Sequence, residues 1–545
     1  MFHHRSPDLI LEEGCNPVGV AALTGRARAS PRAGVRIELS EASMQQASTR
    51  SPTSQIRPEA FGYDQARHLL WRAGFGGTPE QVQTLVSWGP TRAVDYLLDA
   101  EKVAFREVRA DEFNSSIMRP PTAEEQATIR RARQTQDENA LAQLRLEQQR
   151  RQRDDRRQIR EVQRWWLARM IETPRPLEEK MTLFWHGHFA TSYRTIEDSY
   201  HMFQQNQMFR SHALGNYGDL MFRIIRDPAM LAYLDNNDSR RDRPNENLAR
   251  ELMELFSLGV GNYTERDIKE GARALTGYTF RDDEFFFDQG NHDTGAKDIL
   301  GVRGNLDGDG FVRAILARPA CSRFMCRKLY AFFAAELPEN DRDLSRDSSA
   351  ALREMASEML RSRYAVKPVL RRLFLSEHFY SPEVMGQHIK SPTELVVGAV
   401  RSLLTPARDL SILLDAMDLM GQSLLFPPSV AGWAGGRAWI NTSTLFVRQN
   451  ILAYLLTGKR PQGYDPLADE QKYDPAPLLS GLDESARTDP SRVIDYLLRF
   501  TIGGSPAHAR ATLEQFVASH GGRVSNDMIT GLLLIITAMP EYQLT

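Results

Sequence analysis

Two histidines separated by one residue, His186 and His188, are side chains of a type and spacing that could bind a transition metal. Imidazole is the commonest protein ligand for such ions. The surrounding residues follow a helical pattern, in which Met181 and Phe184 share a face with His188. On a helix the two imidazoles diverge by about 200°, so one ion does not easily take both unless Gly187 loosens the turn. The alternative is a hydrogen-bonded imidazole in an aromatic core.

The segment from Arg243 to Gly259 is predicted to be one amphipathic helix that carries more acid and amide groups than packing requires. Asn247, Glu251 and Glu254 form a stripe beside its apolar face. This stripe suits either metal ligation or an ion pair with a nearby arginine such as Arg273.

A third candidate is the loop over residues 291–297, which offers His292 and Asp293 on a predicted surface turn. His292 is expected to act as a metal ligand or a general base, with Asp293 orienting its ring. We expect the histidine pair, the acidic stripe and His292 to converge on one divalent ion. Mixed imidazole and carboxylate ligands suit Zn, Mn or Fe.

The segment Asn305–Gly310 is similar to the start of a calcium-binding loop, but the match then fails. The twelfth position of that loop is Leu316, where calcium needs a bidentate glutamate. Asp309 is instead expected to cap a helix that begins near Phe311.

A Gly- and Pro-rich segment, Pro427–Asn441, contains Trp433, Arg437, Trp439 and Asn441. Paired tryptophans with an amide could stack on and hydrogen-bond a sugar or a peptide. Such loops also serve to lock helices together, which is the alternative. The glycines do not match a phosphate-binding loop.

Composition narrows the classes of function. The 545 residues contain 68 basic and 70 acidic side chains, and this balance predicts no nucleic-acid partner. No stretch reaches the roughly 18 apolar residues of a membrane span. The N-terminal residues show no apolar signal-peptide core, so the sequence as read indicates a cytoplasmic protein. The three cysteines exclude a disulfide framework.

The pattern along the chain predicts a mainly α-helical fold with a few short strands or hairpins. Residues 1–57 are rich in Ser, Ala, Arg, Pro and Gly and are predicted to be disordered. A main helical domain is expected over 58–460, with a projecting charged helical arm at about 122–160 that is polar on all sides. Residues 461–545 are predicted to be a linker followed by helices.

Several long blocks together resemble one family. They include HLLWRAGFGGTPEQV from His68, EEKMTLFWHGHFATS from Glu178, RPNENLARELMELFSLGVGNYTERDIKEGARALTGYT from Arg243, IKSPTELVVGAVRSL from Ile389, and LFPPSVAGWAGGRAWINTSTL from Leu425. They are similar to the bacterial domain-of-unknown-function family 1800. The resemblance implies a large, mostly helical protein of no settled activity, often exported and often encoded beside a family similar to sulfatases and alkaline phosphatases. The export signal usual in the family is missing from this N-terminus.

Two readings of the function follow. The first is a metal-dependent enzyme, a hydrolase or an oxidoreductase, in which the ion activates water, or oxygen if it is iron. The second is a non-enzymatic binding or assembly protein of the cell envelope. It would use the charged arm and the tryptophan loop to hold a partner such as the sulfatase-like neighbour.

Overall fold

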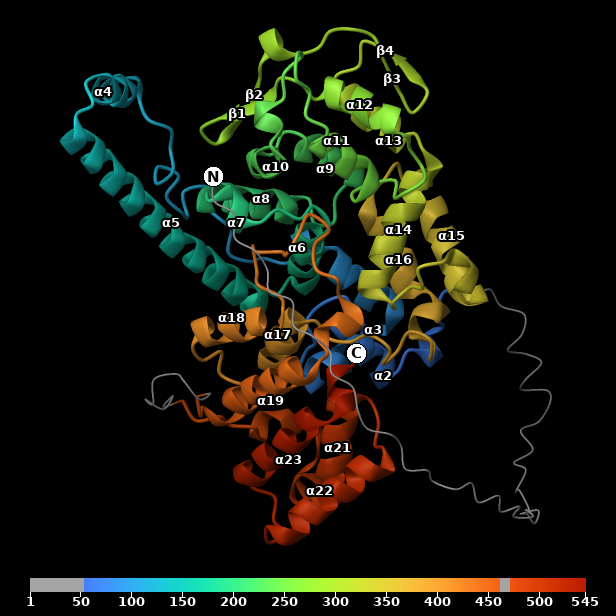
Figure 1. The fold of residues 1–545 in the computed structure, drawn as a ribbon. Coiled ribbons are helices and arrows are strands. Elements are labelled where there is room, and N and C mark those ends of the chain that lie inside the picture. The colour runs from blue at the N-terminus through green and yellow to red at the C-terminus, as the bar shows by residue number, and fades with distance from the viewer. Residues whose placement is uncertain (1–52, 461–470) are drawn as a thin grey trace, which may run out of the picture. The chain divides into compact units, whose positions relative to one another are not determined.

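The computed structural model describes residues 53–460 and 471–545, and Figure 1 shows how their elements are arranged. Contacts group the residues from Ser51 to Thr545 into one unit. The unit is mainly α-helical, as the sequence predicts, and the strands in its described part form two small hairpins. The predicted disordered segment lies almost wholly outside the described residues. The boundaries proposed at residues 57 and 460 stay predictions.

The first two helices, α2 (Tyr63–Arg72) and α3 (Pro79–Leu98), form where local capping signals place them. The Thr78 hydroxyl accepts the backbone N–H of Gln81 at 3.2 Å, and Pro79 takes the first helical position. Gly89, with φ of 73°, then kinks α3 directly before Pro90.

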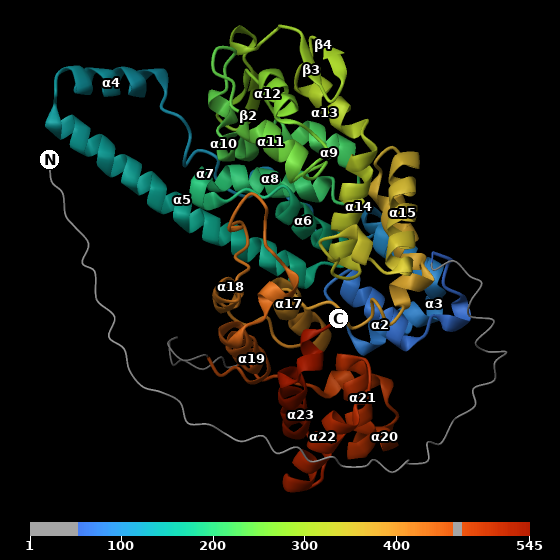
Figure 2. The same cartoon turned by 45° about the vertical axis from the view of Figure 1, so that its right-hand side comes forward.

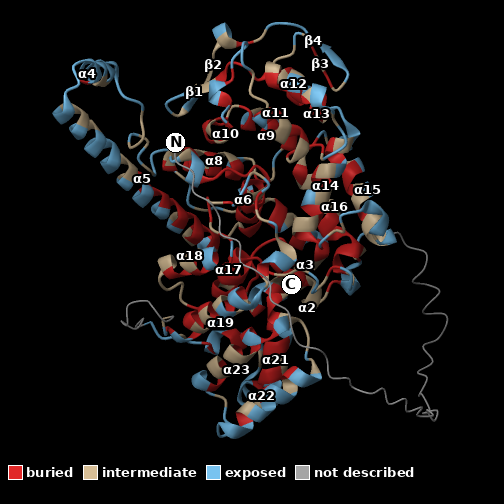
Figure 3. Cartoon of the chain, viewed as in Figure 1, coloured by how far each residue is buried: buried red, intermediate tan, exposed pale blue. Residues whose placement is uncertain are grey.

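The predicted arm consists of two helices, α4 (Ala123–Gln134) and α5 (Glu138–Glu172), rather than one long stretch. Gln136 adopts φ of 52°, and the Asp137 carboxylate then caps α5 by accepting the N–H groups of Asn139 and Ala140. Figures 1 and 2 both show α4 and the first half of α5 away from the other helices. This part is mostly exposed, whereas from Asp155 on one face of α5 is buried (Figure 3).

Helix α6 (Pro176–His188) is buried on almost every side and joins the two hydrophobic clusters of the unit. Met181, Phe184 and Trp185 belong to one cluster, whereas Leu183 belongs to the other. A short helix, α7 (Tyr193–Ile196), and then α8 (Ser199–Ser211) follow it. Helix α6 therefore places its side chains at the centre of the described fold.

The predicted helix over Arg243–Gly259 is shorter in the structure, where α11 covers only Asn247–Glu254. The residues before it form a turn in which the Asn245 side-chain oxygen accepts the N–H of Asn247 at 2.9 Å. After α11, Gly259 adopts φ of 76° and donates its N–H to the Met253 carbonyl, which ends the helix. The neighbouring helices are α9 (Tyr217–Ile224), α10 (Pro228–Tyr233) and α12 (Glu265–Ala274).

Two antiparallel hairpins follow α12. In the first, β1 (Tyr278–Arg281) pairs with β2 (Glu284–Phe287). In the second, β3 (Lys297–Ile299) pairs with β4 (Val302–Gly304). The next helix, α13 (Gly308–Leu316), is capped by Asp307 and not by Asp309, so that prediction was wrong. Asp309 instead pairs with Arg226 at 2.6 Å.

The remaining helices complete the two clusters. Helices α14 to α16 pack in the cluster that contains α2 and α3, whereas α17 to α19 and α21 to α23 pack with the buried face of α5. Their bounds are α14 (Pro319–Phe333), α15 (Arg346–Arg361), α16 (Val366–Leu375), α17 (Pro392–Leu403), α18 (Leu410–Leu419), α19 (Thr442–Thr457), α20 (Glu484–Thr488), α21 (Pro490–Ile502), α22 (Ala507–Ser519) and α23 (Asn526–Ala538). Across residues 53–460 and 471–545, no helix is both long and apolar enough to cross a membrane.

Candidate ligand-binding pocket

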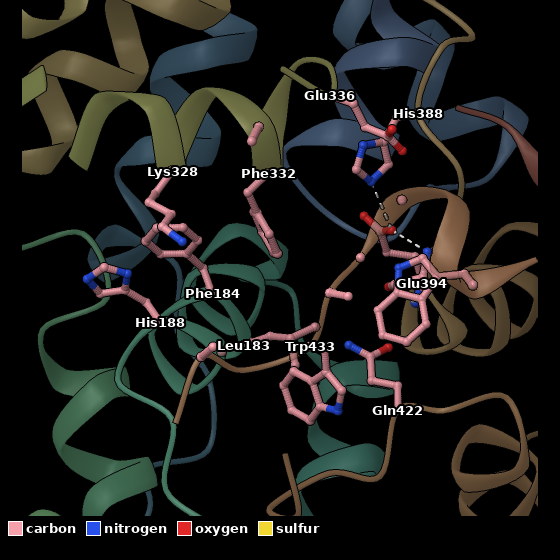
Figure 4. Close-up of a pocket in the computed structure, with 18 of the residues that line it drawn as sticks. Leu183, Phe184, His188, Lys328, Phe332, Glu336, His388, Glu394, Gln422 and Trp433 are labelled. Carbon is pink, nitrogen blue, oxygen red and sulfur yellow. Dashed lines mark hydrogen bonds and ion pairs between the residues drawn. The ribbon is translucent and has the colours of Figure 1, made fainter. Parts of the chain in front are cut away.

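A cavity of about 400 Å³ lies between α6, α14, the start of α17 and the loop over residues 427–441 (Figure 4). Its apolar lining is dominated by aromatic rings, namely Phe184 from α6, Phe332 from α14, and Trp433 and Trp439 from the loop. This volume is at the lower end of the range typical of small-molecule sites.

The loop covers α6 because two glycines let the chains approach closely. A Cβ atom added at Gly432 would lie 2.2 Å from the Gly187 carbonyl oxygen, and Gly432 also has φ of 78°. Only glycine fits both conditions without a shift of the backbone. The Gly187 position lies under the Trp433 ring, within ordinary contact distance. The glycine between the two histidines therefore serves loop packing.

His188 is one of the polar groups that line the cavity. Burial lowers its pKa to about 3, so the imidazole is neutral at physiological pH. Its Nε2 lies 2.9 Å from the carbonyl oxygen of Phe256, which can only accept a hydrogen bond. Nε2 therefore carries the proton, and Nδ1 is left as an acceptor.

Lys328, Glu336 and Gln422 supply further polar groups to the lining. Lys328 and Glu336 are exposed, although the protein around the Lys328 ammonium still lowers its pKa. The Gln422 side-chain oxygen accepts the N–H of Thr393 at 2.9 Å, so its NH2 group remains to donate. The cavity thus offers donors and acceptors around an aromatic interior.

A buried charge network forms the wall at the start of α17. Glu394 accepts a hydrogen bond from Lys180 Nζ at 2.5 Å and another from the Ser391 N–H at 2.7 Å. Arg72 and His388 lie 3.8 and 3.6 Å from its carboxylate. Burial would raise the pKa of Glu394, but these neighbours, led by Lys180, hold it well below its usual range. Glu394 is therefore ionised, and Figure 4 shows it facing His388.

This network is not predicted from the sequence. The only local signal is the Ser391–Glu394 spacing of a capping box, which the structure confirms as a cap of α17. The second role of Glu394 depends on Lys180, which lies 214 positions earlier in the chain.

The predicted metal ligands do not come together as one group. Within the described parts of the chain, a single set of three His, Cys, Asp or Glu side chains has ligand atoms close enough for one ion, and it contains none of these residues. His186 is buried, with its ring 5.5 Å from those of Trp166 and Trp433. It packs in the aromatic core and does not line the cavity.

The acidic stripe of α11 has local partners of its own. Glu254 accepts a hydrogen bond from Tyr263 at 2.5 Å, and burial together with Glu254 raises the pKa of Glu251. Asn247 is exposed. The predicted arginine partner, Arg273, pairs with Asp293 at 2.7 Å instead, so the Arg273 reading of the stripe was wrong.

His292 and Asp293 tie their loop to the end of α12. His292 Nδ1 lies 2.8 Å from the Thr276 carbonyl oxygen, and its ring packs against Phe287. The hydrogen bond from Arg273 lowers the pKa of Asp293. The Asp293 carboxylate thus accepts hydrogen bonds from the Arg273 guanidinium and the Gly295 N–H.

The predicted binding residues of the tryptophan loop divide into two groups. Trp433 and Trp439 line the cavity together with His188. Asn441 caps α19 by accepting the Thr444 N–H at 2.9 Å, and Arg437 is exposed. The loop thus both presents rings to the cavity and fixes the start of a helix.

The model of one protein family, described as "Protein of unknown function (DUF1800)", matches residues 68–544. The chain belongs to this family. The match includes every residue that lines the cavity, so the cavity lies within the family region of this DUF1800 chain. Neither the curated proteins nor the solved structures contain a match.

Proposed function

We propose that the protein binds a carbohydrate in the cavity beneath the tryptophan loop. The observation that carries this proposal is the pair Trp433 and Trp439, held over a cavity of about 400 Å³ with polar groups around them. Indole rings stack on the apolar face of a sugar ring, while its hydroxyl groups need partners at the edge.

The polar lining suits hydroxyl groups, which both donate and accept hydrogen bonds. Gln422 and Lys328 donate, whereas His188 Nδ1 and the Glu336 carboxylate accept. A peptide ligand would need an extended groove or a strand edge. No residue of the four described strands lines the cavity, which favours the sugar over the peptide.

The proposal belongs to the non-enzymatic reading of the sequence. A sulfatase-like partner, a metal-dependent reaction at the residues named from the sequence and export to the cell envelope stay predictions.

Isothermal titration calorimetry of the folded chain tests the proposal. The ligands are neutral and acidic mono- to trisaccharides and short peptides. We expect Trp433→Ala to weaken sugar binding at least tenfold, which is about 1.4 kcal/mol. Trp433→Phe should retain part of the stacking. The matched control is Trp88→Ala, which removes a partly buried tryptophan on α3 that does not line the cavity.

Binding of peptides but not sugars contradicts the proposal, as does equal affinity in the wild type and Trp433→Ala. Circular dichroism of each variant shows whether the helices are retained. A sugar that binds equally well after Trp433→Ala would have another site.

A further inference from the structure

The N-terminus of α8 and the turn of the first hairpin bring together a second cluster of chemically active side chains. It consists of Asp198, His201 and Asp283, none of which lines the cavity described above. One ligand atom from each lies within 4.8 Å of the others. In residues 53–460 and 471–545 this is the only such group of three.

The distances around His201 match those between ligands of a small divalent ion. His201 Nε2 lies 3.2 Å from the Asp283 carboxylate and 3.2 Å from the Asp282 carbonyl oxygen. Metal–ligand bonds of about 2.0–2.1 Å in a tetrahedron place neighbouring ligand atoms roughly 3.3 Å apart. Each hairpin oxygen thus lies at ligand-to-ligand spacing from His201 Nε2, where an ion would replace the proton on that nitrogen.

Asp198 is held with one oxygen available. Its Oδ1 caps α8 by accepting the N–H groups of Tyr200 and His201. Its Oδ2 lies 3.8 Å from Nδ1, the ring nitrogen that the hairpin oxygens do not contact, and a carboxylate oxygen of Asp198 is within 4.8 Å of the other two ligand atoms. The His201 side chain is only 6% exposed, and the Phe280 ring packs edge-on against it. The cluster therefore differs from an exposed acidic loop, because its imidazole is buried and lies between groups from two separate elements.

The cluster also adjoins open space. Asp283 lines a second cavity of about 530 Å³, together with Tyr200, Arg223 and Asp227. An ion held by Asp283 would therefore be reachable by water or by a small ligand.

We propose that Asp198, His201 and Asp283 bind one divalent transition-metal ion, with the Asp282 carbonyl as a fourth ligand. One imidazole and two carboxylates suit Zn, Mn or Fe. The ion would link α8 to the β1–β2 hairpin. The competing arrangement is a protonated His201 that bridges the two aspartates with no metal.

Metal analysis of the full chain tests the proposal. The protein is treated with a chelator, reloaded with ZnCl2, MnCl2 or Fe(II) under anaerobic conditions at pH 7.5, and then desalted. We expect one ion per chain and a rise in the thermal midpoint on loading. His201→Gln and Asp283→Asn should each weaken binding at least tenfold. The matched control is Asp282→Asn, which removes a neighbouring negative charge but keeps the backbone carbonyl. Its positive φ of 52° is one that asparagine tolerates.

Cobalt substitution of the wild type gives a readout that does not depend on the folding of any variant. Visible d–d absorption at one equivalent of Co²⁺ supports an ordered site. Loss of this absorption in Asp283→Asn shows that Asp283 is one of the ligands. Either of two results overturns the proposal. One is the absence of stoichiometric binding by the wild type, which leaves the protonated bridge. The other is unchanged binding in both His201→Gln and Asp283→Asn.

Discussion

Replacing Glu179 by alanine should destabilise the protein more than any neighbouring acidic substitution on α6. The Glu179 side chain is fully buried and accepts four hydrogen bonds, from Arg169 Nε at 2.7 Å, Arg210 Nε at 2.7 Å, Arg210 Nη2 at 3.0 Å and Trp166 Nε1 at 3.1 Å. Burial would raise the pKa of Glu179, but Arg210 and Arg169 outweigh burial and lower it. The carboxylate is therefore charged and connects α5, α6 and α8.

Glu179→Ala leaves two buried guanidinium groups without their shared anion. Removing one partner of a buried ion pair costs about 3–5 kcal/mol, a large share of the 5–15 kcal/mol typical of a folded domain. Urea unfolding followed by tryptophan fluorescence and circular dichroism measures the loss. The control is Glu178→Ala, because its contacts to Arg175 and Arg169 are 3.5 and 3.9 Å long, and burial outweighs them and raises the pKa of Glu178. We expect that control to cost less than about 1 kcal/mol. Equal losses in the two variants would refute the reasoning.

Two further outcomes are expected. Burial lowers the pKa of His186 and His188 to about 3, so near pH 6.5 the unfolded chain takes up protons that the folded chain does not. The free energy of unfolding should therefore fall below about pH 6.5, by up to roughly 1.4 kcal/mol per pH unit for each histidine. Equal urea midpoints at pH 7.5 and pH 5 would contradict this. Gly432→Ala should lower the thermal midpoint more than Gly435→Ala. Both glycines have φ near 75°, but only a side chain at position 432 would clash with Gly187. Equal thermal midpoints of the two variants would show that the contact between the loop and α6 matters little.

Elements with strong local signals were the predictable part of the fold. Helices α15 and α19 begin at the side-chain caps Ser345 and Asn441, which act over a few residues, and α15 also has a regular apolar face. The helix expected over Arg243–Gly259 was too long, since its periodicity continues into turns that hydrogen bonds from Asn245 and the conformation of Gly259 impose.

The sequence predicted single residues of the cavity but not the way in which they are grouped. His188, Trp433 and Trp439 stand out by type and do line one cavity, but their neighbours Lys180 and Glu394 look like ordinary helix residues. Residues hundreds of positions apart are brought together by tertiary packing, and a single sequence does not show which distant segments pack together. The same reason explains why the predicted metal ligands, sensible one at a time, do not form one group.

The wall network has a consequence for how the chain folds during synthesis. Arg72 lies on α2, the first α-helix of the described chain, yet its guanidinium donates to the carbonyls of Phe332 and Phe333. Arg67, one turn earlier, donates to the carbonyl of Thr501, 434 positions later. At about 5–20 residues per second, α2 waits tens of seconds on the ribosome before these acceptors exist. Although α3 packs on α2 as soon as it is made, these hydrogen bonds form only then, so we expect the chain to complete folding after release.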